Sequence, residues 1–176
     1  MTMNPLRVAC AATLMAVLGL PVLAAPGAHE HGVARLSVAV DGRTLSLEFD
    51  APLDGLLGFE RPPRTDAERK AAADLLQRLR DPAARFKPDA AAGCSAGAAT
   101  VSAPVLEPGA KAGGEHADVE LQFSFTCSAP QALRTLDVGL FDAFRRLQRV
   151  DVQLAGARLQ SRHTLKRPAR SLPLVR

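Results

Sequence analysis

Four histidines hold most of the metal-binding chemistry that this sequence offers, and two of them form the motif His29-Glu30-His31. In extended backbone, residues i and i+2 project to the same side, with Cα atoms about 6.6–7 Å apart. Two imidazoles in this spacing can converge on one ion at a Zn–N distance of about 2.0–2.1 Å. His116 and Asp118 repeat the spacing. We predict a metal site formed by His29, His31, His116 and Asp118.

The chemistry of these side chains narrows the choice of metal. Nitrogen and carboxylate donors without a thiolate suit Zn²⁺, with Cu²⁺ and Ni²⁺ as alternatives. A competing interpretation is that the His-Glu-His segment is a disordered chain start and that His116 is an ordinary solvated side chain. We expect His163 to face the core rather than a metal, because it shares strand parity with Leu159 and Leu165.

The sequence offers little for catalysis. It has no HExxH, GxxxxGK[ST] or GxGxxG motif. The two histidines of His29-Glu30-His31 are two positions apart, whereas the metalloprotease motif separates its histidines by four. Since no nucleophile has a recognisable paired base, we expect a protein that is not an enzyme.

Composition limits the remaining function classes. The chain has 176 residues, 47% hydrophobic and 23% charged, which fits one globular domain. Only 4% are aromatic, with no Trp or Tyr, so stacking platforms for single-stranded nucleic acid are not expected. The net charge of +4 is a mild basic excess that specifies no partner.

Residues 1–24 are typical of a signal peptide. Arg7 precedes an uncharged apolar run over Val8–Leu20, and Val22 and Ala24 take the −3 and −1 positions of a cleavage site before Ala25. The run is too short to span about 30 Å of hydrocarbon. We expect export to the periplasm without stable membrane insertion, and a retained membrane anchor is the alternative.

Export leaves two cysteines, Cys94 and Cys127, once Cys10 is removed with the signal peptide. An even pair in an exported chain favours a disulfide. Closing this loop of 33 residues should stabilise the fold by about 3–4 kcal/mol. A thiolate zinc site is the alternative, but neither cysteine has a second ligand at suitable spacing.

Alternating apolar residues predict a sheet. Val33–Val40 and Thr44–Asp50 alternate on both sides of Asp41-Gly42, a type I′ turn signal that indicates a hairpin. Further strands are expected at Val119–Cys127, Val150–Leu154 and Leu159–Leu165, with a weaker one near Ala99–Leu106.

Helical signals are fewer. Thr65 and Glu68 form a capping box that starts a helix ending near Arg80, and short helical turns are expected at Pro52–Phe59 and Leu140–Leu147. The sequence therefore predicts a single α+β domain over residues 25–165. Its sheet is mainly antiparallel, and one face is covered by the amphipathic helix at about 65–80. Residues 166–176 are expected to form a basic, solvated tail.

Several segments together resemble the ZrgA-like zinc-uptake accessory proteins, which are small exported bacterial proteins. They are His29–Gly32, Ala51–Arg69, Ala91–Cys94, Glu115–Cys127 and Leu136–Leu154. The resemblance implies a periplasmic zinc-binding protein that supports zinc acquisition and cooperates with a transporter component. It also implies that His29, His31, His116 and Asp118 carry the metal and that the two cysteines form a structural pair.

This chain differs from the family pattern in two places. Members often carry alternating histidines and acids in the loop before the Glu115 segment, whereas here the loop over 107–114 has no histidine. Arg61 stands where a histidine is common. The resemblance therefore implies one zinc site of modest affinity and no high-capacity zinc store.

Overall fold

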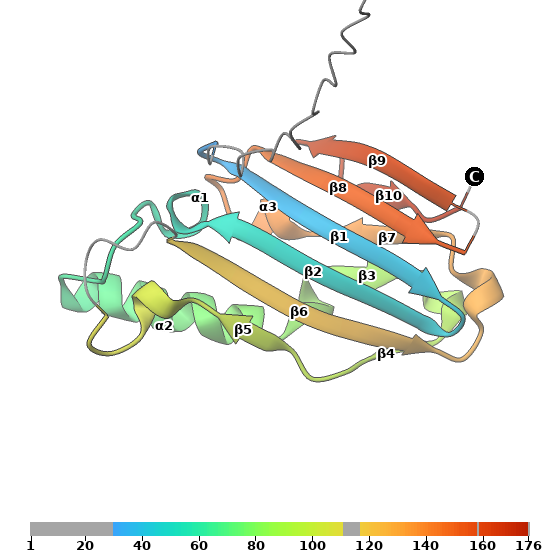
Figure 1. The fold of residues 1–176 in the computed structure, drawn as a ribbon, viewed down its shortest axis with the longest axis horizontal. Coiled ribbons are helices and arrows are strands. Elements are labelled where there is room, and N and C mark those ends of the chain that lie inside the picture. The colour runs from blue at the N-terminus through green and yellow to red at the C-terminus, as the bar shows by residue number, and fades with distance from the viewer. Residues whose placement is uncertain (1–29, 111–116, 158, 176) are drawn as a thin grey trace, which may run out of the picture.

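In the computed structural model of the chain, residues 30–110, 117–157 and 159–175 are described. Their largest element is a seven-stranded sheet with the strand order β4-β6-β2-β1-β8-β9, in which β5 also pairs with β6 (Figure 1). The strands are β1 (Val33–Asp41), β2 (Thr44–Pro52), β4 (Cys94–Ala96), β5 (Thr100–Ser102), β6 (Asp118–Cys127), β8 (Arg149–Gly156) and β9 (Leu159–Lys166).

The predicted hairpin is confirmed in β1 and β2, which pair antiparallel from Arg35 opposite Asp50 to Asp41 opposite Thr44. The turn needs a positive backbone φ, and Gly42 supplies it with a φ of 53°. The predicted strand at residues 119–127 is confirmed as β6, which pairs antiparallel with the other side of β2. Alternating apolar residues thus place three neighbouring strands correctly.

One pairing departs from an antiparallel sheet. β1 runs parallel to β8, with Val33 opposite Arg149 and Val40 opposite Gly156. All other strand pairs in this sheet are antiparallel, including the predicted pairing of β8 with β9. The mainly antiparallel α+β fold is therefore confirmed, with one parallel pair, β1 and β8.

One face of the large sheet carries a second layer that the sequence predicted only in part. The predicted helix is confirmed as α2 (Asp66–Leu79). Beside it lies a three-stranded sheet in the order β10-β7-β3, formed by Ser171–Pro173, Thr135–Val138 and Phe86–Pro88. Figure 1 shows both behind the large sheet, so the predicted helix shares this face with a small sheet that the sequence did not predict.

The C-terminal segment also differs from the solvated tail that was expected. β10 pairs antiparallel with β7, and Leu172 and Leu174 are buried. The physical reason is the spacing of these leucines, because side chains two positions apart in a strand point to the same side. Here that side faces the core, and the basic residues between β9 and β10 lie at the surface.

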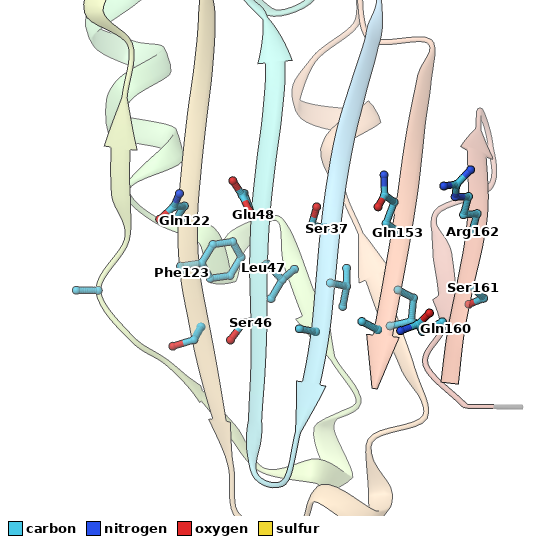
Figure 2. A pocket seen from close by; sticks show the side chains of 16 residues that line it. Ser37, Ser46, Leu47, Glu48, Gln122, Phe123, Gln153, Gln160, Ser161 and Arg162 are labelled. Atoms are coloured by element: carbon cyan, nitrogen blue, oxygen red, sulfur yellow. The ribbon is translucent and has the colours of Figure 1, made fainter. Parts of the chain in front are cut away.

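Among the described residues, no helix or strand covers the opposite face of the large sheet, which is turned towards the viewer in Figure 1. It holds a hollow of about 1000 Å³ lined by residues of five strands and by Ala98 (Figure 2). Hydroxyl and amide side chains such as Ser37, Ser46 and Gln122 share the lining with apolar residues such as Leu47 and Phe123. Its two charged residues, Glu48 and Arg162, have opposite signs.

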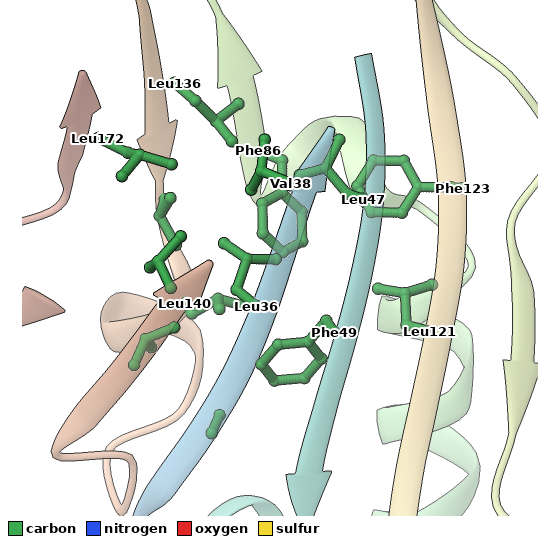
Figure 3. Close-up of a cluster of buried hydrophobic side chains, with 14 of the residues drawn as sticks. Leu36, Val38, Leu47, Phe49, Phe86, Leu121, Phe123, Leu136, Leu140 and Leu172 are labelled. Atoms are coloured by element: carbon green, nitrogen blue, oxygen red, sulfur yellow. The ribbon is translucent and has the colours of Figure 1, made fainter. Parts of the chain in front are cut away.

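The core lies between the two layers (Figure 3). Phe86 of the small sheet meets Phe49 and Phe123 of the large one, with ring centroids 6.5 Å and 5.2 Å apart. Leu136, Leu140 and Leu172 complete the small-sheet side, and each is fully buried. Burial of such side chains contributes about 1.5–3 kcal/mol each to the folded state.

The start of α2 is fixed by the predicted capping box. The backbone N–H of Glu68 donates to Oγ1 of Thr65 (3.1 Å), and the N–H of Thr65 donates to Oε2 of Glu68 (3.2 Å). Arg61 donates two hydrogen bonds to the same carboxylate, at 3.0 Å and 2.7 Å. These bonds lower the pKa of Glu68 to about 2, with Arg61 as the largest cause. Arg61 thus stabilises this helix start.

The disulfide predicted from the sequence is confirmed. Cys94 lies in β4 directly opposite Cys127 at the end of β6, and the two are bonded. Two short helices follow as predicted, α1 (Leu53–Leu57) and α3 (Leu140–Ala143). Within the described residues, no helix combines the length and apolar character needed to cross a membrane.

Candidate metal site

The sheet topology brings the two metal-binding motifs of the sequence to the same end of the molecule. β1 and β6 each pair antiparallel with β2, on its two sides, so β1 and β6 run in the same direction. Both therefore begin at one end of the sheet, where β2 ends and α1 begins (Figure 1). The two starts are separated by one strand, which corresponds to about 10 Å. We call this end of the sheet, from His31 to α1 and Asp118, the metal edge.

His31 contacts the loop that follows β2. Its Nδ1 atom lies 3.2 Å from Oδ2 of Asp54 and 4.0 Å from Oε1 of Glu60. The imidazole is 74% exposed, and the Asp54 side chain is 31% exposed. A carboxylate that accepts a hydrogen bond from one ring nitrogen fixes the tautomer and orientation of a metal-binding histidine. The contact with Asp54 therefore leaves Nε2 as the nitrogen available to a metal ion.

A close backbone approach places His31 beside α1. Gly32 has a φ of 74°, and a Cβ atom there would lie 3.0 Å from the carbonyl oxygen of Arg146. A Cβ on Gly55 would lie 3.6 Å from the Cα of Gly32, so the chain start and α1 nearly touch. Glycine at position 32 is required both by the left-handed backbone and by this lack of space. The Gly after His31 thus holds the histidine over Asp54.

The middle residue of the motif points elsewhere. Glu30 accepts two hydrogen bonds from the guanidinium of Arg149 on β8, at 2.6 Å and 3.3 Å. Arg149 also donates from Nε to Asp151 at 3.1 Å. The hydrogen bond with Glu30 is the largest cause of a raised pKa for Arg149. The motif is therefore held on two sides, because Glu30 binds Arg149 of β8 and His31 contacts Asp54 of α1.

Asp118 is the first residue of β6 and lies opposite Pro52. The carbonyl of its neighbour Ala117 accepts a hydrogen bond from the backbone N–H of Leu53 (2.9 Å). This bond joins the start of β6 to the same turn that carries Asp54. Asp118 therefore reaches the metal edge, with a half-buried side chain.

His29 and His116 lie outside the described residues, so their part in the site stays a prediction. Each is close in sequence to a residue at the metal edge, His31 in one case and Ala117 in the other. Among residues 30–110, 117–157 and 159–175, no group of three or more His, Cys, Asp or Glu side chains could hold a metal ion.

Asp54 and Glu60 were missed as site residues in the sequence, although both lie in the segment Ala51–Arg69 that carries the family resemblance. Their distance from His31 along the chain hides the contact. His163 behaves as expected: it lies opposite Val152 on β8, and the half-buried imidazole hydrogen-bonds through Nε2 to Oγ of Ser161 at 2.9 Å. It is therefore held within β9, apart from the metal edge.

The comparison with protein families decides which group the chain comes from. A model described as "ZrgA family zinc uptake protein" matches residues 28–174. This chain belongs to the ZrgA family. No curated protein matches the chain.

Membership in the ZrgA family confirms the resemblance seen in the sequence. The match begins just before His29 and ends at Leu174, so it includes both motifs, the disulfide and the small sheet. It connects the chain with zinc uptake.

Proposed function

We propose that this ZrgA-family protein is a periplasmic zinc-binding protein, not an enzyme, that supports zinc acquisition by passing zinc to a transporter component. Zinc binds at the metal edge through His29, His31, His116 and Asp118, with Asp54 orienting His31. The observation that carries the proposal is the contact of His31 with Asp54 at the end of the sheet where β6 also begins.

The exposure of the site fits a zinc ion that is bound and released better than a zinc ion that stabilises the fold. Structural zinc sites are closed and contribute directly to folding, whereas sites that exchange their ligands stay open. His31 is 74% exposed, and the fold has its own disulfide and core. Zinc is therefore cargo, and the protein is expected to fold without it.

Isothermal titration calorimetry with Zn²⁺ on residues 25–176 tests the proposal. We expect about one zinc per chain, and we expect His31→Ala and His116→Ala each to weaken binding about 10- to 100-fold, as loss of a ligand or its partner does. Asp54→Asn should weaken binding less than His31→Ala. His163→Ala is the matched control and should bind like the parent protein. Absence of binding heat, or binding heat unchanged from the parent protein in both histidine variants, would contradict the proposal.

The same titration has an expected pH dependence. Imidazole must be neutral to bind zinc, and unperturbed imidazole takes up a proton near pH 6.5. Zinc affinity should therefore be highest above pH 7 and fall as the pH drops below about 6.5. An affinity unchanged between pH 7.5 and pH 5.5 would exclude histidine ligands.

A second function has one observation in its favour. Arg61, at a position where family members often have histidine, is fully engaged by Glu68 and lies 5.2 Å from the centroid of the Phe59 ring. This fits a protein that keeps the fold and binds an envelope partner without metal. A partner recovered from zinc-starved cells equally well by a variant lacking all four histidines would favour this function.

A further inference from the structure

A groove with a basic border lies between α1, α2 and the residues that follow α3. Its volume is about 310 Å³. We call it the arginine groove, and its lining is formed by Leu56, Leu57, Ala71, Asp74, Leu75, Arg78, Ala143, Phe144, Arg145 and Arg146. No histidine or cysteine takes part, so its chemistry is distinct from that of the metal edge.

The three arginines of the groove lack carboxylate partners among the described residues. Arg78, Arg145 and Arg146 are exposed and form no ion pair there. The one acid in the lining, Asp74, is held by Lys70 at 2.8 Å. Elsewhere on the surface, arginines such as Arg149 are paired with acids. Unpaired guanidinium groups around a groove attract carboxylates, which they bind in two-pronged hydrogen bonds.

The floor of the groove is apolar. Leu75 and Phe144 are buried, and Leu56 and Leu57 are half-buried, so part of each leucine remains open to a ligand. An apolar floor with a charged border suits a segment that presents one or two apolar side chains between acidic residues. A simple inorganic anion would use the border and leave the floor exposed to water.

We propose that the arginine groove is the docking site for an acidic segment of a protein partner. The carboxylates of the segment bind Arg78, Arg145 and Arg146, and an apolar side chain between them covers Leu56 and Leu57. A second copy of this chain is a poor occupant, because its net charge is +4 and its sequence has no two adjacent acidic residues.

The position of the groove relates docking to the metal edge. The carbonyl of Gly32, next to His31, accepts hydrogen bonds from the backbone N–H groups of Gln148 and Arg149, at 2.7 Å and 3.1 Å. α1 likewise carries both Asp54 and the two groove leucines. A segment seated in the groove would lie next to His31. If the proposed function holds, this places a zinc acceptor beside its cargo; docking itself does not require zinc.

Fluorescence anisotropy tests docking, with zinc-free protein of residues 25–176. The probe is a fluorescein-labelled peptide, Glu-Asp-Leu-Leu-Glu-Asp. We expect the double variant R78E/R145E to weaken binding about 10-fold or more, because reversed charges repel the carboxylates. The control K87E/R162E changes net charge equally, at two exposed positions outside the groove. It should bind within about 2-fold of the parent protein, since distant charges are screened at physiological salt.

A second peptide, Glu-Asp-Gly-Gly-Glu-Asp, tests the floor. It should bind at least about 10-fold more weakly than the leucine peptide, because it has no apolar side chain to cover Leu56 and Leu57. Equal binding of both peptides, equal loss in both double variants, or full displacement by millimolar inorganic phosphate would overturn the proposal in favour of unspecific anion attraction. These results are independent of zinc, so they separate failure of docking from failure of zinc binding.

Discussion

The two ends of β6 are held in opposite ways. At its C-terminal end, Cys127 is fully buried, bonded to Cys94, and its backbone N–H donates to Arg43. At its N-terminal end, Asp118 is half-buried, and the metal edge around it is held by polar contacts. One strand thus links a covalently fixed end to an end that is open to solvent.

The difference between the two ends of β6 indicates that the stability of the fold depends little on the contacts at the metal edge. The contact of His31 with Asp54 and the pair of Glu30 with Arg149 each join an exposed side chain to a half-buried one, and such surface pairs add little to stability. A disulfide contributes several times more. Changes at the metal edge are therefore not expected to threaten the fold, because the other end of the sheet and the core provide most of the stability.

Removal of the disulfide is expected to have the largest effect. The variant C94S/C127S should lose about 3–4 kcal/mol of unfolding free energy, because the loop is no longer closed in the unfolded chain. Urea unfolding followed by circular dichroism measures the loss. Zinc affinity of the folded variant should stay within about 2-fold of the parent value, since distant sites behave independently. A parallel loss of zinc affinity would show that the two ends are coupled.

Breaking the ion pair of Glu30 and Arg149, at the opposite end of the sheet, is expected to have a smaller effect, on zinc binding. Glu30→Gln and Arg149→Met should each weaken zinc binding about 3- to 10-fold, less than loss of a group that contacts a ligand. The cause is a less ordered His-Glu-His segment, so both changes together should weaken binding no more than either alone. Calorimetry of all four proteins tests this. Additive losses would show that the pair does not act as one unit, and urea midpoints should hardly move.

The smallest expected effect is on stability at low pH, through Glu68 at the start of α2. The folded-state pKa of Glu68 is about 2, below its usual value of 4.5, mainly because of Arg61. Its stabilising contribution is therefore complete above pH 4.5 and disappears as the pH falls towards 2. Glu68→Gln should lower the urea midpoint slightly at pH 7 and not at pH 2. A difference that persists at pH 2 would assign the effect to packing rather than charge.

Much of the fold could be predicted because it depends on local patterns. Alternation located β1, β2, β6, β8 and β9, and the capping box located α2. The parallel pairing of β1 with β8 could not be predicted, because it joins segments more than a hundred residues apart. The small sheet was missed for a related reason, since β3 and β10 are three residues each and too short for a clear alternation.

In the candidate site, too, local features could be predicted and contacts between distant segments could not. His31 could be predicted from its spacing, and the common end of β1 and β6 supports the hypothesis that distant motifs meet. Asp54 and Glu60 could not be recognised as its neighbours, because the turn after β2 brings them there only in three dimensions. The ion pair of Glu30 with Arg149 could not be predicted either. It depends on the parallel pairing of β1 with β8, which local sequence patterns do not reveal.

The place of β9 at the border of the large sheet affects how copies of this protein meet. A bare outer strand invites pairing with another molecule, and natural proteins discourage this with charge. β9 carries Arg162 and Lys166, both exposed, on a strand of eight residues. Two such strands approaching each other would bring like charges together, which favours a protein that resists self-association when crowded.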